Sequence, residues 1–333
     1  MNDSGASKSG CFSLPFIMFG VVGLVAALYS AYWVWMSGEI RKGAVDWVEA
    51  QRNWGSTVEY SDLSVSGYPF RFVLQADDPV MQNVLPQTRW EGETLQLIAQ
   101  SWNLNHILIR IPGENDVRLP DRQEVTFYPG DKTIGSLVFK DGRLKRLGLE
   151  APELNGEFGT GEAFELAGLS LGLAPMPDTA TDLKLALSLD ELSLPSAVDG
   201  AEWLGDQLDH LVVWIEVENF YPLVEGELTE TEWKVDRNQI HLRRGELEMG
   251  PLKAASQASV TLDRDNNPDG TVGVHLLEPE TLKSALEAEG VMTRDIETVI
   301  NTLKAINSNG AFATVKVKDR KFSLPIIGTI GEY

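Results

Sequence analysis

The sequence is poor in cysteine, in histidine and in basic residues. Its 333 residues include one cysteine, Cys11, and four histidines, and 28 lysines and arginines stand against 49 aspartates and glutamates, for a net charge of -21. A body this acidic is repelled by the phosphates of nucleic acids and by an anionic membrane surface. The composition therefore predicts no nucleic-acid partner, and it requires any membrane contact to come from an apolar segment.

Motifs of catalysis and metal binding are also scarce. Ser170 has the flanking glycines of a nucleophile elbow, but the apolar alternation around it predicts a strand, and Pro175 follows where that motif needs a helix. The alternating oxygen side chains from Asp263 to Asp269 lack the glycine and glutamate of a calcium loop and predict a polar hairpin turn. The histidines lack the spacing of a zinc helix. We expect a non-enzymatic protein with no catalytic residues, no cofactor and no metal.

One long apolar segment lies near the N-terminus. From Phe12 to Met36 the only ionisable side chains are tyrosines. A helix of this length spans about 37 Å at about 1.5 Å per residue, more than the roughly 30 Å hydrocarbon core of a bilayer. The alternatives are a buried core helix and a cleaved signal peptide, but a signal peptide has a shorter apolar run and a small-residue cleavage site. We predict an uncleaved transmembrane helix over 12–36. Its membrane-anchoring residues are Phe16, Ile17, Phe19, Val21, Val22, Leu24, Val25, Leu28, Tyr32, Trp33 and Trp35.

The sequence indicates the orientation of this helix in the membrane less clearly than its presence. Lys8 precedes it, whereas Arg41 and Lys42 follow it, so a literal count of positive charges places the body in the cytoplasm. The short N-terminal tail instead resembles a signal-anchor, and large domains cross a membrane largely regardless of charge. The body also has no cysteine, which suits an oxidising compartment. We predict a single-pass protein of a bacterial inner membrane, with residues 1–11 in the cytoplasm and the body, 56–333, in the periplasm.

Apolar residues continue at partial helical spacing after the span. Ile40, Ala44 and Trp47 predict a short juxtamembrane helix over 37–55, ended by Gly55. The alternative is that these residues extend the membrane helix.

From residue 56 onward the dominant period is two, which is typical of antiparallel strands with one face on a core and one face in water. The alternation from Leu183 to Leu189 changes phase at Leu192, which predicts a bulge near Asp190. The same alternation over residues 231–235 predicts a further strand. The fold class that follows is mainly β (α+β), with a transmembrane helix before a large curved antiparallel sheet that has a few helices packed on it.

Turns and helices complete this prediction. Asp141-Gly142 and Asp269-Gly270 are hairpin-turn signals. Helical spacing predicts helices over 200–210, 280–289 and 293–306, the last capped by its first residue, a threonine, and separated from the second by a break at a glycine. Two prolines make 173–182 the best candidate for a seam within the body.

The most distinctive stretch reads, from the residues alone, as a turn that leads into a core strand. This motif consists of Gly67, Tyr68, Pro69, Phe70, Arg71 and Phe72. Together with the anchor and the pattern from Trp90 to Gly113, it resembles an uncharacterised alphaproteobacterial family of inner-membrane-anchored proteins, a domain of unknown function. The C-terminal half is also loosely similar to the strand-rich repeats of AsmA-like envelope proteins, as in 246–252 and 315–325. That second resemblance implies an open, curved sheet with an apolar inner face suited to lipid.

Two functions are consistent with these features. In the first, the anchored sheet presents an apolar groove to a lipid or an acyl chain. In the second, an envelope interaction or assembly protein without a small-molecule ligand binds another envelope protein. The two differ in whether helices such as the one predicted over 293–306 fill the inner face of the sheet. A third function, an envelope hydrolase, rests on Ser170 alone.

Overall fold

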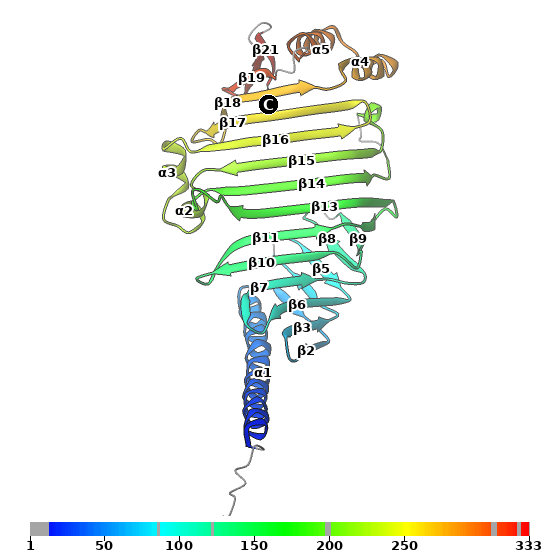
Figure 1. Ribbon diagram of the computed structural model, residues 1–333. Coiled ribbons are helices and arrows are strands. Elements are labelled where there is room, and N and C mark those ends of the chain that lie inside the picture. Colours follow the sequence, from blue (N-terminus) through cyan, green and yellow to red (C-terminus); the bar gives the residue numbers. More distant parts are fainter. Residues whose placement is uncertain are drawn as a thin grey trace, which may run out of the picture.

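The computed structural model describes residues 13–84, 87–120, 123–196, 201–307, 312–324 and 328–332. These residues form one long helix and one antiparallel sheet of 21 strands, with shorter helices at its margins (Figure 1). The predicted fold class, mainly β with a large curved antiparallel sheet, is confirmed. Residues 1–12, which include the predicted N-terminal tail, lie outside the described residues.

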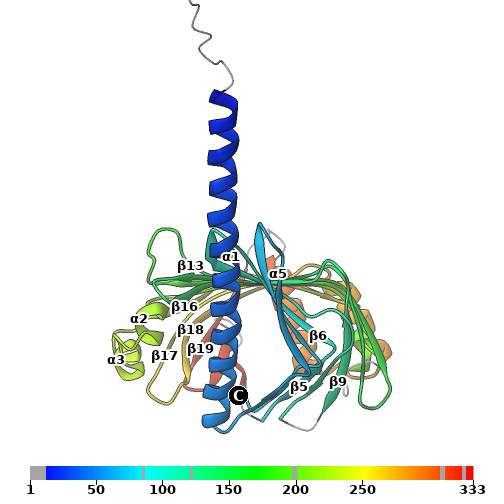
Figure 2. The same ribbon diagram turned by 90° about the horizontal axis from the view of Figure 1, so that it is seen from below.

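The N-terminal helix α1 (Ser13–Asn53) covers both the predicted span and the predicted juxtamembrane helix as one continuous element. It is long and apolar enough to cross a membrane. The helix ends just before Gly55, which has a φ of +87°, a conformation that glycine adopts without steric cost. The first half of α1 projects from the sheet, and its second half lies beside the strands (Figure 2).

The sheet has two branches near α1, because the long strand β13 (Ala163–Pro175) pairs with one strand over 169–173 and with another over 163–166. From its free edge, the first branch contains β2 (Asp62–Ser66), β3 (Arg71–Asp77), β6 (Thr94–Gln100), β7 (Asn103–Arg110), β10 (Ile134–Lys140) and β11 (Arg143–Ala151). The second branch contains β1 (Thr57–Glu59), β4 (Val80–Gln82), β5 (Arg89–Gly92), β8 (Asn115–Arg118), β9 (Glu124–Pro129) and β12 (Leu154–Phe158).

Beyond β13 each strand pairs with the next one along the chain. These strands are β14 (Leu183–Ser193), β15 (Gln207–Val217), β16 (Gln239–Met249), β17 (Leu252–Leu262), β18 (Pro268–Leu276), β19 (Ala313–Lys318), β20 (Lys321–Leu324) and β21 (Gly328–Glu332). Because β13 pairs with β14 along its length, the sheet continues through the region of the predicted seam at 173–182.

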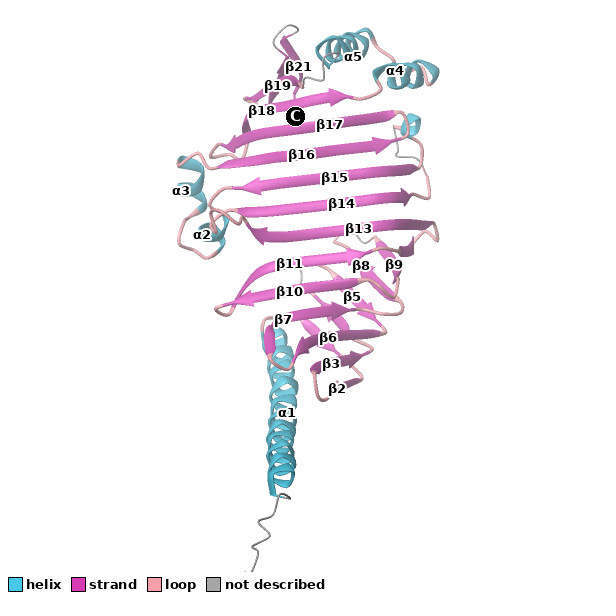
Figure 3. Cartoon of the chain, in the orientation of Figure 1, coloured by secondary structure: helices cyan, strands magenta, loops and turns pink. Residues whose placement is uncertain are grey.

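The remaining helices lie at the two sides of the sheet, where strands end, and at its far end (Figure 3). At the far end, α4 (Pro279–Ala288) and α5 (Arg294–Asn307) match the helices predicted over 280–289 and 293–306. The hydroxyl of Thr293 accepts a hydrogen bond from the Ile296 amide at 3.2 Å, so the predicted cap is present. At one side lies η1 (Glu202–Leu204), between β14 and β15, and at the other side lie α2 (Phe220–Val224) and α3 (Glu230–Val235), between β15 and β16.

Three local predictions were wrong. The strand predicted over 231–235 is helix α3, which a capping box between Thr229 and Glu232 begins. The helix predicted over 200–210 is η1 followed by β15, within the residues that the structure describes. The turn predicted at Asp269-Gly270 lies inside β18, and the hairpin turns earlier, where the Asp263 carboxylate accepts hydrogen bonds from the Asp265 and Asn267 amides at 2.8 Å each.

Of two other local predictions, one is confirmed. Asp141 and Gly142 join β10 to β11 with φ values of +54° and +76°, as a tight hairpin requires. The bulge predicted near Asp190 is not found in β14: the backbone is irregular at Glu191, whose φ is +51°, but no residue is inserted there. The register of β14 with its two neighbours is the same on both sides of this residue, and the register shift falls between β15 and β16.

Candidate functional site: an apolar groove on the sheet

A hollow of about 700 Å³ lies where α1 passes between the two branches of the sheet. Ile40, Ala44 and Trp47 line it from α1, since residues three and four apart share one face of a helix. The first branch contributes residues such as Ile109, and the second contributes Trp90. All of the lining side chains are apolar. We call this space the proximal hollow.

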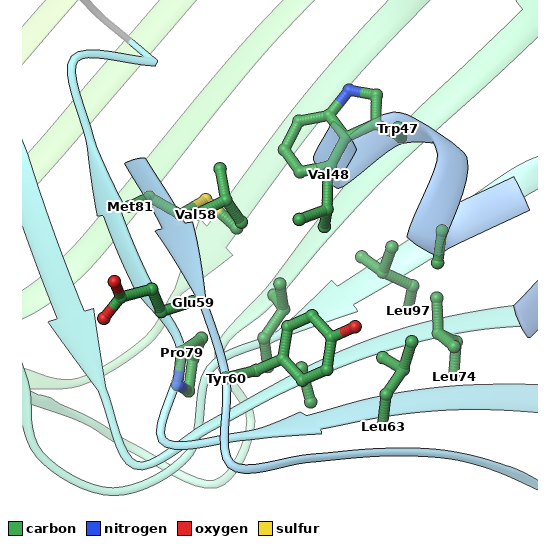
Figure 4. Close-up of a pocket in the computed structure, with 13 residues that line it drawn as sticks. Trp47, Val48, Val58, Glu59, Tyr60, Leu63, Leu74, Pro79, Met81 and Leu97 are labelled. Atoms are coloured by element: carbon green, nitrogen blue, oxygen red, sulfur yellow. The ribbon is translucent and has the colours of Figure 1, made fainter. Parts of the chain in front are cut away.

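A smaller cavity of about 70 Å³ adjoins the proximal hollow and shows how α1 is held (Figure 4). Val48 is only 6% exposed and points from the helix into this cavity, with Val58 and Met81 on one side and Leu74 on the other. The guanidinium of Arg52 donates a hydrogen bond to the Val58 carbonyl oxygen at 2.6 Å. The C-terminal half of α1 is therefore fixed against the strands.

Apolar residues continue from the proximal hollow across the sheet. Directly opposed residues of antiparallel strands point to the same face, so the pairing register defines rows of side chains. One row runs through Ile109, Gly135, Leu149, Leu171, Leu187 and Val213. Val213 lines a second hollow, of about 430 Å³, over β15 to β17, which we call the distal hollow. At about 4.8 Å per strand the row covers about 24 Å.

A second row on the same face runs parallel to the first. It passes through Ile107, Leu137, Leu147, Leu173, Leu185, Ile215 and Leu242. The opposite face is polar at the corresponding places, where Ser170 pairs with Glu150 on one side and with Ser188 on the other. We call the face that bears the two apolar rows the groove.

The middle of the groove is only partly covered. Leu149, Leu171 and Leu187 are half-buried, and none of them belongs to the buried core. The described helices pack at the two ends: α1 contacts β1 to β3, and α5 contacts β18 and β19. The helix predicted over 293–306 therefore closes the far end of the groove and leaves its middle open.

Charged side chains gather away from the groove. At the side of the sheet, the ammonium of Lys145 on β11 donates a hydrogen bond to one carboxylate oxygen of Glu225 at 2.8 Å. The other carboxylate oxygen lies 2.6 Å from a guanidinium nitrogen of Arg143. The bond from Lys145, followed by the charge of Arg143, lowers the pKa of the Glu225 carboxyl below its ordinary value. On the outer face Arg244 pairs with Glu246 at 2.8 Å, which lowers the pKa of that carboxyl too. An apolar groove with charges outside it suits an uncharged, hydrophobic ligand.

The predicted anchor residues lie on the part of α1 that projects from the body. The side chain of Phe16 lies outside the described residues. Most of the other anchor side chains are well exposed, namely those of Ile17, Phe19, Val21, Val22, Leu24, Val25, Leu28 and Trp35. Tyr32 is 36% exposed. Trp33 differs, because its ring stacks on Phe72 with centroids 5.2 Å apart. The exposed set leaves an apolar helix surface on all sides before the body begins.

The motif residues 67–72 are brought directly against this helix. Gly67 to Phe70 form the turn between β2 and β3, as predicted, and Phe72 is a buried core residue. Gly67 has a φ of +101°, and a Cβ there would lie 2.8 Å from the Arg71 carbonyl oxygen, so glycine is required. Sequence reasoning missed that the turn packs on Trp33, since Trp33 and Tyr68 meet edge to face at 5.5 Å.

The remaining candidate sites form no reactive cluster. Ser170 lies in the middle of β13 and not at a strand-to-helix turn. His210 pairs with Asp190 at 2.6 Å on the sheet surface. Within the described ranges, no group of three or more histidine, cysteine, aspartate or glutamate side chains is placed to hold a metal ion.

The groove itself was only partly recognised in the sequence. Leu185 and Leu187 were predicted to share one face of a strand, but the residues contributed by α1 and by Trp90 were not assigned to it. A usable signal was the repetition of apolar alternation in strand after strand, which requires one long apolar face if neighbouring strands pair in register.

Comparison with known proteins gives one result for nearly the whole chain. Among curated proteins no match was found. A family of bacterial proteins matches residues 33–327, from the aromatic end of the anchor through the groove to the far end of the sheet. The chain therefore belongs to the family described as "Uncharacterized protein conserved in bacteria (DUF2125)".

Proposed function

We propose that this protein is a non-enzymatic, membrane-anchored envelope protein whose groove binds a lipid or another acyl chain. The observation that carries the proposal is the pair of apolar rows that connect the proximal hollow to the distal hollow. Each methylene group that moves from water onto such a surface contributes about 0.8 kcal/mol. A long acyl chain laid along the rows would therefore gain several kcal/mol without any polar contact.

The position of the groove relative to the anchor supports the same proposal. Helix α1 continues without a break from its exposed apolar part to Ile40, Ala44 and Trp47, which line the proximal hollow. Ile40 follows Trp33 by seven residues, or about 10 Å along the helix. The proximal hollow would thus lie close to the membrane from which an acyl chain comes.

We propose a bacterial inner membrane as the site of the anchor and the periplasm as the compartment of the body. The apolar span and the cysteine-free body support this placement. Alkaline phosphatase fused after Tyr333 is expected to be active in cells, because that enzyme needs an oxidising compartment. An inactive fusion together with a fluorescent cytoplasmic-type reporter at the same place would reverse the orientation.

Site-specific photocrosslinking tests the groove. A photoreactive phenylalanine analogue at Leu187 would face the groove, whereas the same analogue at Ser188 would face outward from the adjacent position of β14. Expressed in cells, the protein is expected to form a lipid adduct at Leu187, detected by mass spectrometry of the purified chain, and little or none at Ser188.

Two results would contradict lipid binding in the groove. No lipid adduct at Leu187, or equal adducts at both positions, would reject lipid binding in the groove. A crosslink from Leu187 to another protein would instead favour the interaction or assembly function, with a protein partner covering the groove.

A further inference from the structure

A second group of exposed apolar side chains lies beside α1, apart from the groove. Tyr68 and Phe70 are 54% and 68% exposed in the turn between β2 and β3, and Trp102 is 68% exposed in the turn between β6 and β7. The two turns are joined, because the Ser101 amide donates a hydrogen bond to the Phe70 carbonyl oxygen at 3.1 Å. We call Tyr68, Phe70 and Trp102 the collar.

The position of the collar along the axis of α1 follows from the contacts of its two turns with that helix. Tyr29 donates a hydrogen bond to the Pro69 carbonyl oxygen, and its hydroxyl lies 2.7 Å from the Ser101 hydroxyl. Tyr29 follows Ser13, the first residue of α1, by 16 residues, which is about 24 Å of helix. The hydrocarbon core of a bilayer is about 30 Å thick. If α1 spans the membrane, the turns that contact Tyr29 stand at the membrane boundary.

The hydrogen bonding of the two turns suits a place with little water. Tyr32 donates to the Ser101 carbonyl oxygen at 3.1 Å, and the indole of Trp33 donates to the Arg71 carbonyl oxygen at 3.2 Å. The Tyr68 hydroxyl lies 2.8 Å from the hydroxyl of Ser30. The helix thereby satisfies backbone carbonyl groups that would be costly to leave unpaired in a membrane.

We propose that the collar enters the bilayer interface on the side of the body and forms a second membrane contact besides the α1 span. Tyrosine and tryptophan favour this interface, since each has an apolar ring and one polar group. Arg71, next to the turn, is exposed and can place its charge among lipid head groups. Two contacts would hold the body at a fixed tilt, and the collar does not depend on whether the groove binds lipid.

Fluorescence quenching in nanodiscs tests this contact on the full chain. In a Cys11→Ser background, single cysteines replace Phe70, Trp102 or Trp54 and carry an environment-sensitive fluorophore. Trp54 is the matched control, because it is also an exposed tryptophan, at 79%, but it follows Trp33 by 21 residues, about 32 Å along the helix. Leu24→Cys, on the exposed apolar helix, reports full membrane burial.

In phosphatidylcholine nanodiscs with spin-labelled phosphatidylcholine, the labels at positions 70 and 102 are expected to be quenched at least threefold more strongly than the label at position 54. Their emission should also shift to shorter wavelength. Quenching at both positions no stronger than at position 54, in variants with the circular dichroism of the parent, would overturn the proposal. Because the collar side chains are exposed, these substitutions leave the core intact.

Discussion

The end of the sheet next to α1 and the middle of the sheet show the same alternation of apolar residues but differ in what covers it. At the end next to α1, Phe72 is 1% exposed, because Trp33 of α1 stacks on it. In the middle Leu171 and Leu187 remain half-buried. Alternation therefore identifies the apolar face of a strand, whereas elements distant in sequence decide whether that face is buried.

The far end of the sheet resembles the end next to α1 more than it resembles the middle. Leu276 on β18 packs with Leu282, Leu286, Ile300 and Leu303 of α4 and α5 in one buried cluster. Helices thus cover apolar side chains at both ends, with the proximal hollow left beside α1, whereas the middle is held by long paired strands, of which β13 has 13 residues and β14 has 11. An apolar face that is only partly covered between two ends with packed helices suits a hydrophobic ligand.

The largest effect is expected where α1 covers the sheet. Phe72→Ala removes a fully buried ring and its stacking on Trp33, so the free energy of unfolding should fall by about 3 to 5 kcal/mol. Denaturant unfolding of the detergent-solubilised full chain measures this change. A loss below about 1 kcal/mol would mean that α1 does not cover this end of the sheet in solution.

A truncation in the middle of the sheet tests directly whether the two regions differ in burial. Leu187→Ala removes an apolar side chain that is only half-buried, so its cost should be clearly smaller, about 1 kcal/mol or less under the same conditions. A cost equal to that of Phe72→Ala would show that the groove is closed by other parts of the chain or by a tightly held ligand, and that the two regions do not differ.

The sequence predicted most strands because each has one face on the groove or core and one face in water. It failed over 231–235, where three alternating residues are too few to separate a period of two from a helical turn; the capping residues Thr229 and Glu232 were the better signal. It failed again over 200–210, where the apolar spacing of Trp203 and Leu208 looked helical although a run rich in β-branched residues begins nearby.

Other features could not be read from local patterns at all. The division of the sheet into two branches depends on β13 pairing with β11 over one half and with β12 over the other. The docking of the motif turn on Trp33 joins residues about 38 positions apart. Both are long-range contacts, and periodicity within a segment carries no information about which distant segment it meets. Hence the groove-forming strands were predictable, and the packing of α1 on the end of the sheet was not.

The smallest effect is expected at the edge, where Glu225 holds the end of α2 to β11. Hydrogen bonding from Lys145 lowers the pKa of the Glu225 carboxyl in the folded protein, so its stabilising contribution is present above the ordinary carboxyl pKa of about 4.3 and is lost as the pH falls through the lowered folded value. Glu225→Gln should therefore lower the midpoint of thermal unfolding slightly at pH 7, with the difference from the parent shrinking toward pH 3.

Glu227→Gln is the matched control, since Glu227 is close in sequence but forms no ion pair with the described residues. A pH-independent difference for Glu225→Gln, or an equal shift in the control, would show that this pair does not hold the edge of the open region.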